Sequence, residues 1–378
     1  MKARLGDYIQ EYSIRNKAEE DIPVYSVTNT QGFCQDYFGK EVASKDKSTY
    51  KIVPRGCFAY NPSRINVGSV DWQRNEDRVI VSPLYNVFSV SPQLNQQYLY
   101  YYLKSDYALQ RIRAVATGSV RDNLKLAMLY EFPIRLPSIE QQKEIVERLD
   151  RAKHVISLRE QELQTLDDLV KARFVEMFGD PVGNEKGWPT RPLLSMGSCK
   201  NGMNFHYDDS GVEINCLGVG DFKDYSIIAN TAALPTVSLN KMPPPEYLLR
   251  DDDIVFVRSN GNKKMVGRSV AVYPGVVPTT FSGFCIRYRR EDDSVITPYL
   301  LRVLKAESIR QKMYGRGANI QNLNQQTLSL LDIPVPPKAM QEQFAAFVSQ
   351  VDKSKVAVQA SLDKAQLLFD SLMQEYFG

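Results

Sequence analysis

The sequence predicts a mixed α/β fold in which two β-rich α/β lobes alternate with two long helices that pair as an antiparallel coiled coil. Three observations support this prediction. Apolar residues recur at alternating steps of four and three in two stretches, residues 145–178 and 344–376. The second half of the chain repeats motifs of the first half. Short runs of β-branched and aromatic residues precede each stretch.

The two long stretches have the pattern of a helical pairing surface. The predicted seam consists of Ile145, Leu149, Ile156, Leu163, Leu166 and Val170 in the first helix and Val351, Val358, Leu362, Phe369 and Leu372 in the second. Arg159, Arg173 and Lys355 interrupt it. Each stretch ends at a Phe-Gly pair, where glycine can take the left-handed cap position. A stripe this narrow favours pairing with another helix, although an ordinary core helix is the alternative.

An internal repeat divides the chain into two units. YLYYYLKS (residues 98–105) is echoed by YLLRVLKA (residues 299–306), and GSVRDNL (residues 118–124) by GANIQNL (residues 317–323). EFPIRLPSIEQQ, from residue 131, resembles DIPVPPKAMQEQ, from residue 332, so the offset between copies varies by a few residues around 200. We expect a first lobe at residues 1–136, a helix at 137–180, a second lobe at 181–336 and a second helix at 337–378.

Within each lobe, strands and one helical segment are expected. The runs at residues 22–27, 79–90, 253–259 and 268–273 have strand character and are bounded by turn residues. A helix is expected at residues 95–116 and again at 298–314. If the long helices pair antiparallel, the lobes lie at opposite ends of a rod of about 40 Å. That length suits two half-sites on duplex DNA, which lie about 34 to 36 Å apart when separated by one helical turn.

Composition favours an intracellular protein. Lys and Arg total 47 against 44 Asp and Glu, with the lobes mildly basic and the helical segments mildly acidic. The five cysteines have no CxxC spacing and suit a reducing cytoplasm, and the two histidines cannot complete a recognisable zinc motif. The start of the chain has no apolar signal region, and no uninterrupted apolar stretch is long enough to cross a membrane.

Catalytic motifs are weak. LGVGD, residues 217–221, contains a GxG, but the next residues, FKDYSII, do not form a clean helix start, so a nucleotide or methyl-donor site there is poorly supported. With two histidines, His154 and His206, no Ser/His/Asp arrangement is arguable. The sequence therefore favours a protein with no catalytic, cofactor or metal site of its own.

Side chains suited to nucleic acid gather in predicted loops. Asn and Arg can make paired contacts to adenine and guanine edges, and Lys mostly contacts phosphate. Solvated polar hairpins are the alternative, and Asn or Ser at the repeated GSVRDNL and GANIQNL segments could equally cap helices or bind phosphate. The candidate residues are Asn61, Arg64, Asn66, Ser119 and Arg121 in the first lobe and Arg258, Asn260, Lys263, Lys264, Arg268, Asn319 and Gln321 in the second.

The order of parts resembles the specificity subunit of type I restriction-modification systems, over essentially the whole chain. The resemblance lies in LPSIEQQKEIVERLD (from residue 136) and VPPKAMQEQFAAFVSQVD (from residue 335), which begin the two helices. It also lies in NPSRINVGS (from residue 61), VGDFKDYSI (from residue 219) and DIVFVRSNGNKKMVGRS (from residue 253).

This resemblance implies a non-catalytic DNA-recognition subunit. Each lobe would be a target-recognition domain that reads one half of a bipartite double-stranded DNA site. The helix pair would space the lobes and dock two modification (methyltransferase) subunits, to which restriction subunits can add. S-adenosylmethionine would be bound by the partner methyltransferase. The rival hypothesis is a coiled-coil interaction scaffold whose lobes bind proteins.

Overall fold

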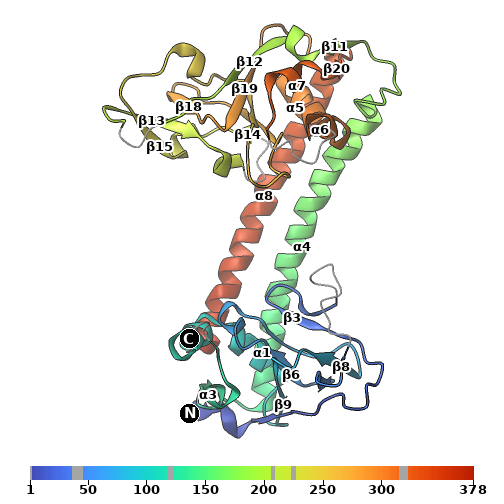
Figure 1. Cartoon of the computed structure of the whole chain (residues 1–378), viewed down its shortest axis with the longest axis vertical. Helices are drawn as coiled ribbons and strands as arrows, with labels where there is room; N and C mark the ends of the chain where they lie inside the picture. Colours follow the sequence, from blue (N-terminus) through green and yellow to red (C-terminus); the bar gives the residue numbers. More distant parts are fainter. Residues whose placement is uncertain (1, 36–45, 117–122, 206–208, 223–226, 315–321) are drawn as a thin grey trace. The chain divides into compact units, whose positions relative to one another are not determined.

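Two long helices and two β-rich lobes make up the chain (Figure 1). The structure is a computed structural model that describes residues 2–35, 46–116, 123–205, 209–222, 227–314 and 322–378. It divides into two compact units. Unit 1 comprises residues 1–162 and 358–378, and unit 2 comprises residues 163–357. Each unit therefore contains one lobe and one end of each long helix.

Unit 1 carries the first lobe. Its strands are β1 (Lys2–Arg4), β2 (Ile9–Glu11), β3 (Ser26–Thr28), β4 (Gly32–Cys34), β5 (Lys51–Pro54), β6 (Phe58–Tyr60), β7 (Val70–Trp72), β8 (Arg78–Val81), β9 (Asn86–Val90) and β10 (Pro133–Arg135). Its helices are α1 (Gln96–Lys104), α2 (Asp106–Val115), α3 (Leu126–Tyr130), the start of α4 (Ile139–Phe178) and the 3-10 turns η1 (Leu5–Asp7) and η2 (Ile65–Val67).

Unit 2 carries the second lobe. Its strands are β11 (Thr190–Pro192), β12 (Gly197–Asn201), β13 (Val212–Leu217), β14 (Ile227–Ile228), β15 (Thr236–Leu239), β16 (Asp253–Val257), β17 (Ser269–Val272), β18 (Thr279–Phe281), β19 (Cys285–Arg290) and β20 (Asp332–Pro334). Its helices are α5 (Thr297–Lys305), α6 (Glu307–Tyr314), α7 (Gln325–Ser329), the start of α8 (Lys338–Phe377) and the 3-10 turns η3 (Leu193–Ser195), η4 (Val219–Phe222), η5 (Thr231–Ala233) and η6 (Pro245–Tyr247).

The central sheets of the two units share one topology. The strand order is β2-β9-β6-β7 in unit 1 and β12-β19-β16-β17 in unit 2, where β14 adds a fifth, parallel strand beside β17. Around them lie the pairs β3-β4 and β5-β8 in unit 1 and the sheet β15-β13-β18 in unit 2. The repeat therefore holds at the level of topology, and the units differ in the strands added around the sheet.

Two sequence expectations about the lobes are corrected. The run at 79–90 is two strands, because a turn at residues 82–85 separates β8 from β9. The helix expected at 95–116 is broken at Ser105, whose side chain accepts a hydrogen bond from the backbone N–H of Ala108 (3.2 Å) and so starts α2. The second lobe breaks at the matching place, between α5 and α6.

Buried glutamines fix the start of each long helix in the same way. The side chain of Gln142 accepts from Asn95 N (2.8 Å) and donates to the carbonyls of Gln93 and Pro137 (2.9 Å each). Gln341 does the same with Ile296 N (2.9 Å), Ser294 O (2.9 Å) and Pro336 O (2.8 Å). The copies are thus 199 residues apart at this point, and Gln142 matches Gln341 rather than Gln343 as the motif comparison suggested.

The first long helix begins earlier than its apolar pattern indicates. The a/d pattern starts at Ile145, whereas α4 begins at Ile139, inside the segment 137–180 that the Pro-rich motif predicts as the helix. Ser138 Oγ accepts from Gln141 N (3.3 Å) and Gln141 Oε1 accepts from Ser138 N (3.1 Å), a capping box that satisfies N–H groups at the helix start. Both α4 and α8 are 40 residues long.

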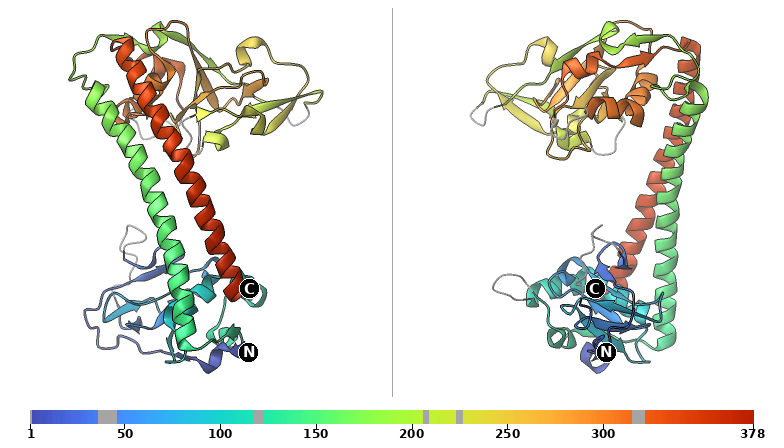
Figure 2. Two further views of the ribbon diagram at one scale, coloured as in Figure 1. Left: turned by 180° about the vertical axis from the view of Figure 1, so that it is seen from behind. Right: turned by 45° about the vertical axis from the view of Figure 1, so that its right-hand side comes forward.

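Within each unit, α4 and α8 run side by side and antiparallel, since the start of one meets the end of the other (Figure 2). The predicted seam residues are all buried or half-buried. Apolar side chains off the seam, such as Leu169 and Leu368, are exposed by 46 and 55%. The a/d pattern therefore marks the less exposed face of each helix.

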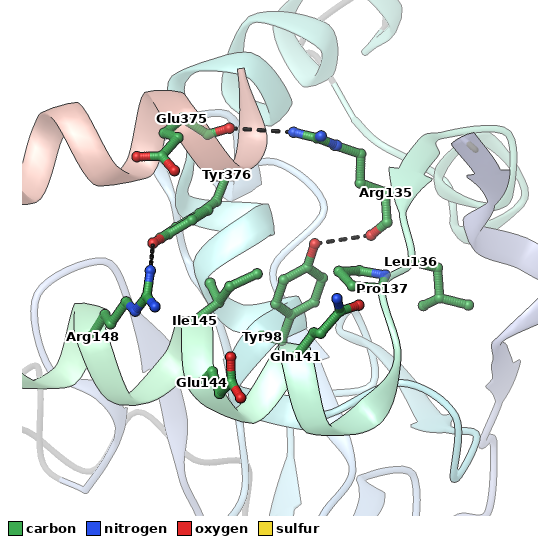
Figure 3. A pocket seen from close by; sticks show the side chains of 10 residues that line it. All are labelled: Tyr98, Arg135, Leu136, Pro137, Gln141, Glu144, Ile145, Arg148, Glu375 and Tyr376. Carbon is green, nitrogen blue, oxygen red and sulfur yellow. Dashed lines mark hydrogen bonds between the residues drawn. The ribbon is translucent and has the colours of Figure 1, made fainter.

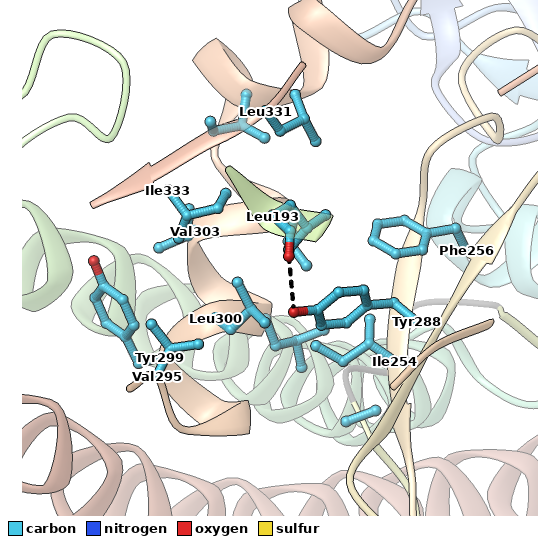
Figure 4. Close-up of a cluster of buried hydrophobic side chains, with 14 of the residues drawn as sticks. Leu193, Ile254, Phe256, Tyr288, Val295, Tyr299, Leu300, Val303, Leu331 and Ile333 are labelled. Carbon is cyan, nitrogen blue, oxygen red and sulfur yellow. Dashed lines mark hydrogen bonds between the residues drawn. The ribbon is translucent and has the colours of Figure 1, made fainter. Parts of the chain in front are cut away.

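In unit 2, an aromatic cluster joins the helix pair to the lobe. Phe174 and Phe178 of α4 lie 5.5 and 5.7 Å from the ring of Phe344 in α8, and Phe178 lies 4.9 Å from Tyr299 in α5. These rings belong to the main core of the unit, part of which Figure 4 shows. Tyr288 Oη in that core donates to Leu193 O (3.1 Å), so its buried hydroxyl is satisfied.

The matching end of unit 1 also packs an aromatic ring on the lobe, Phe377 on Tyr98 (5.0 Å between ring centroids), and it carries polar contacts around a hollow (Figure 3). Arg148, in the place of Phe347, donates to Tyr376 Oη (3.2 Å), and Arg135 donates to Glu375 O (3.3 Å). These bonds attach the end of α8 to β10 and α4. The four bonded residues also line a cavity of about 500 Å³. Its walls are Tyr98, Arg135, Leu136, Pro137, Gln141, Glu144, Ile145, Arg148, Glu375 and Tyr376.

Candidate nucleic-acid interface

The first candidate loop connects β6 to β7 in unit 1. Asn61 Oδ1 accepts from Ser63 N (3.1 Å) and Ser63 Oγ (2.9 Å), and Asn61 O accepts from Arg64 N (3.0 Å). The 3-10 turn η2 follows and closes at Gly68, whose φ of 90° is in the left-handed region. Asn61 thus shapes the loop with its carbonyl oxygens. Arg64 is exposed, and Asn66 is half-buried.

The second candidate loop connects β16 to β17 in unit 2, the equivalent place in the sheet. Asn260 Oδ1 accepts from Asn262 N (2.8 Å) and Asn262 Oδ1 from Lys264 N (3.0 Å), so successive Asn side chains fold the turn. Lys263 and Lys264 are exposed. Arg258 and Arg268 are half-buried at the two ends of the loop, where Arg258 donates to Gly283 O (3.2 Å).

A returning segment meets each loop. Leu124 N donates to Pro62 O (3.1 Å) in unit 1, and Leu323 N donates to Arg258 O (2.8 Å) in unit 2. The structure therefore brings the ends of the GSVRDNL and GANIQNL segments to the candidate loops. The candidate residues Ser119, Arg121, Asn319 and Gln321 themselves lie outside the described residues.

Lys104 connects the first loop to a neighbouring hairpin. Its Nζ donates to Gly68 O (2.5 Å), Asn29 O (2.9 Å) and Asn29 Oδ1 (3.1 Å), which ties the loop to the β3-β4 hairpin. Burial lowers the pKa of Lys104 to about 8, with nearby Asp71 opposing the shift and Lys153 adding to it. The repeat had matched Lys104 with Lys305, but residue type alone did not identify a supporting role.

Lys305 occupies the matching place at the end of α5. Burial lowers its pKa to about 8, Arg302 adds to the shift, and Asp167 of α4 opposes it. Asp167 also forms an ion pair with Lys355 of α8. A cluster of charged groups thus lies where the second lobe meets the helix pair. In unit 1, Lys104 of the lobe and Lys153 of α4 form the corresponding pair of neighbouring charges.

Beside Lys104, Asp71 joins β7 to the hairpin. Burial raises the pKa of its carboxyl group, while the paired guanidinium of Arg74 opposes the shift. Asp71 also accepts from the backbone N–H of Phe33 (3.2 Å). Arg74 lies 4.6 Å from the ring centroid of Trp72, a cation–π contact. This part of unit 1 therefore presents ordered cationic and aromatic side chains.

A metal site and a reactive thiol each place requirements on the described residues. No group of three or more His, Cys, Asp or Glu side chains among them could hold a metal ion. Burial raises the pKa of Cys199 and Cys216 to about 12, so their thiols remain protonated at neutral pH. Across the described part of the chain, no helix is long and apolar enough to cross a membrane.

Comparison with known proteins identifies the family. Residues 6–168 and 245–365 match the family described as type I restriction modification DNA specificity domain. The chain is 24% identical over 301 residues to the type I restriction enzyme StySPI specificity subunit of Salmonella potsdam, covering 74% of this chain and 64% of that protein. It is 30% identical over 112 residues to the EcoKI specificity subunit of Escherichia coli strain K12, covering 28% of this chain and 23% of that protein.

Solved structures share the fold. A chain from a type I R-M system, studied for its complex assembly and conformational transition, gives a TM-score of 0.60 at 18% identity and covers 100% of this chain and 97% of that chain. The type I S subunit from M. genitalium gives 0.53 at 14% identity, with 100 and 96% covered. The chain spans less than two thirds of the length of the two curated relatives from Salmonella and Escherichia. Because the family match includes most of the sequence, the chain belongs to the type I restriction-modification DNA specificity family.

Proposed function

We propose that this chain is the non-catalytic subunit that reads a bipartite DNA sequence for a type I restriction-modification complex. The observation that carries the proposal is the repeated loop between the third and fourth strands of the shared sheet order. In both units this loop carries Asn and Arg side chains and is met by the returning segment after α2 or α6. Each lobe, expected at residues 1–136 and 181–336, then reads one half-site.

The residue types in these loops suit DNA. Exposed Arg64, Lys263 and Lys264 can approach phosphates, and Asn and Arg can pair with base edges in the major groove. The candidates Ser119, Arg121, Asn319 and Gln321 lie outside the described residues, and we propose them from their residue types alone. The relatives from Salmonella and Escherichia are specificity subunits of restriction enzymes, which supports the same function.

The helix segments at 137–180 and 337–378 set the spacing between half-sites and dock two methyltransferase subunits in this proposal. Those partners bind S-adenosylmethionine and carry out the methylation, and restriction subunits can join the complex. The exposed leucines off the seam, Leu169 and Leu368, are apolar surface available to such partners. The complex acts in the cytoplasm, where the DNA is.

The test is selection of DNA by the purified chain bound to its modification partner. A random duplex library is passed over the complex at several salt concentrations, and bound sequences are read. The proposal expects one motif with two fixed halves and a fixed gap, and an affinity whose logarithm falls linearly with the logarithm of salt. Enrichment of no motif, with retention of cellular proteins in place of DNA, would instead favour the scaffold hypothesis.

A further inference from the structure

The turn that precedes β9 recurs before β19. In unit 1, Leu84 N donates to Ser82 Oγ (3.5 Å) and Tyr85 N donates to Ser82 O (3.0 Å). In unit 2, Phe284 N donates to Ser282 Oγ (3.3 Å) and Cys285 N donates to Ser282 O (2.8 Å). The two turns lie at the same point of the shared strand order and have the same hydrogen bonds.

Each turn holds a large apolar side chain in solvent. Leu84 is 77% exposed and Phe284 is 60% exposed. A single exposed leucine is ordinary in a folded protein. Here, however, the same turn exposes an apolar residue in both units, although its neighbours differ: Tyr85 matches Cys285 and Asn86 matches Ile286. Packing of the lobe does not account for either side chain, since neither is buried.

Both turns lie at the candidate loops. Phe284 O accepts from Arg258 N (2.7 Å) and Ser259 N (3.3 Å), so the turn is bonded directly to the start of the second loop. In unit 1, β9 begins at Asn86, which pairs with Tyr60 just before the first loop. The side chain of Asn86 also donates to Leu124 O (3.4 Å) in the returning segment. Turn, loop and returning segment therefore meet at one end of each sheet.

We propose that Leu84 and Phe284 are the apolar base contacts of the two lobes, each pressed against the base pairs of its half-site. This inference rests on the proposed function and names specificity-determining residues for it. Leucine and phenylalanine are side chains that proteins insert against base steps, and apolar side chains also contact the thymine methyl group. The exposed cationic side chains of the loops, Arg64 in unit 1 and Lys263 and Lys264 in unit 2, favour duplex DNA over an apolar protein surface as the occupant.

The experiment uses the full chain in complex with its modification partner and a duplex carrying the selected motif. Leu84→Ala and Phe284→Ala are compared with Val276→Ala, which removes a 98% exposed apolar side chain. Val276 follows β17 beside Gly275, whose N–H bonds Asp251 just before β16 begins (2.9 Å), so it lies at the opposite end of the sheet from Phe284. Binding is measured at several salt concentrations, and thermal unfolding checks that each variant is folded.

Leu84→Ala and Phe284→Ala are each expected to weaken binding roughly 5- to 150-fold, the range seen when a base-stacking side chain is removed. The salt dependence should not change, because no phosphate contact is lost. Base preference should relax only in the half-site of the altered lobe. Phe284→Leu, which keeps an apolar side chain, should retain most of the affinity, and Val276→Ala should bind like the wild type.

Unaltered affinity and base preference in both alanine variants would overturn the inference while leaving the proposed function intact. So would an equal loss on DNA without the motif, because that would indicate general contact rather than base reading. If the wild-type complex itself shows no sequence preference, the proposed function fails and the apolar contacts fail with it.

Discussion

Lys104 shows how one buried cation can hold a recognition loop in place. Its ammonium group bonds both the loop at Gly68 and the hairpin at Asn29, yet burial lowers its pKa from 10.5 to about 8. Between those two values the unfolded chain binds a proton that the folded chain does not. The free energy of unfolding therefore rises with pH across this window, because the unfolded state binds more protons.

Replacing Lys104 by Met should remove that contribution. The unfolding midpoint of the wild type, relative to Lys104→Met, should rise between about pH 8.5 and about pH 10, because both values lie between the folded-state pKa of about 8 and the unfolded value of 10.5. The measurement is thermal unfolding of both proteins at each pH. Lys17→Met, at an exposed position in the same unit, is the control and should follow the wild type. The same pH dependence in Lys104→Met as in the wild type would show that the buried lysine does not titrate in this range.

Lys264 belongs to the surface that we expect to contact phosphate. It is exposed, and its backbone N–H is held by Asn262, so the loop should survive a change of its side chain. Lys264→Ala is expected to weaken DNA binding about equally on all sequences and to lower the salt slope by about 1. Salt titrations of binding check this, with Lys186→Ala in the linker as an exposed control. A change of base preference without a change of slope would contradict the assignment.

Residue types predicted which loops are polar, but not the structural role of each side chain in them. Asn260 and Asn61 stood out as base-reading candidates, and the structure uses their oxygens to fold the turns. Leu84 was not identified, because it lies in the strand-like run 79–90, where an apolar residue is expected to be buried, and Phe284 lies outside the polar loops from which candidates were taken. Only the exposed fraction of these side chains, together with the repeated Ser turn, distinguishes them.

At the scale of elements, the aromatic cluster of unit 2 couples helix pairing to the lobe. Phe344 is fully buried and contacts Phe174 and Phe178. Phe344→Ala should lower the free energy of unfolding of the unit by about 3 to 5 kcal/mol, from lost apolar burial and the cavity left behind. Urea unfolding measures it, with Val356→Ala, 71% exposed on the same helix, as the matched control. Equal stability in the two variants would mean that the cluster contributes little.

The apolar period identified the less exposed face of each helix, but not the residue at which α4 begins. The first turns of α4 are set by the Ser138 capping box and by Gln142, a polar residue that is fully buried. A seam pattern contains no information about such residues, since their burial depends on carbonyl groups supplied by the lobe. For the same reason, Ser105 ended α1 where local periodicity favoured one continuous helix.

At the scale of the whole molecule, the tandem repeat was readable because motifs recur in the same order, and both units do share one strand order. The strands added around each central sheet could not be predicted from the repeat, since the two lobes differ most in these strands. In the proposed function, helix length sets the DNA spacer, because each of α4 and α8 takes part in both units.

Lengthening both helices tests this role. Four residues inserted after Glu162 in α4 and four after Ala357 in α8, the points where the chain passes between units, add about 6 Å of helix to each. The selected motif should keep both half-sites and gain one to two base pairs of spacer, at roughly 3.4 Å per base pair. DNA selection with the lengthened complex measures the gap. An unchanged spacer in a folded, active complex would contradict the spacing role.

The most direct test of the central claim is a map of methylated bases across the genome of the source cell, with and without this chain. If the chain reads DNA for a methyltransferase, its deletion should remove methylation from one bipartite motif and leave all others unaltered. The lost motif would give both half-sites and their spacing. Persistence of methylation at every motif, while the partner methyltransferase is present and active, would contradict the claim that this chain directs modification.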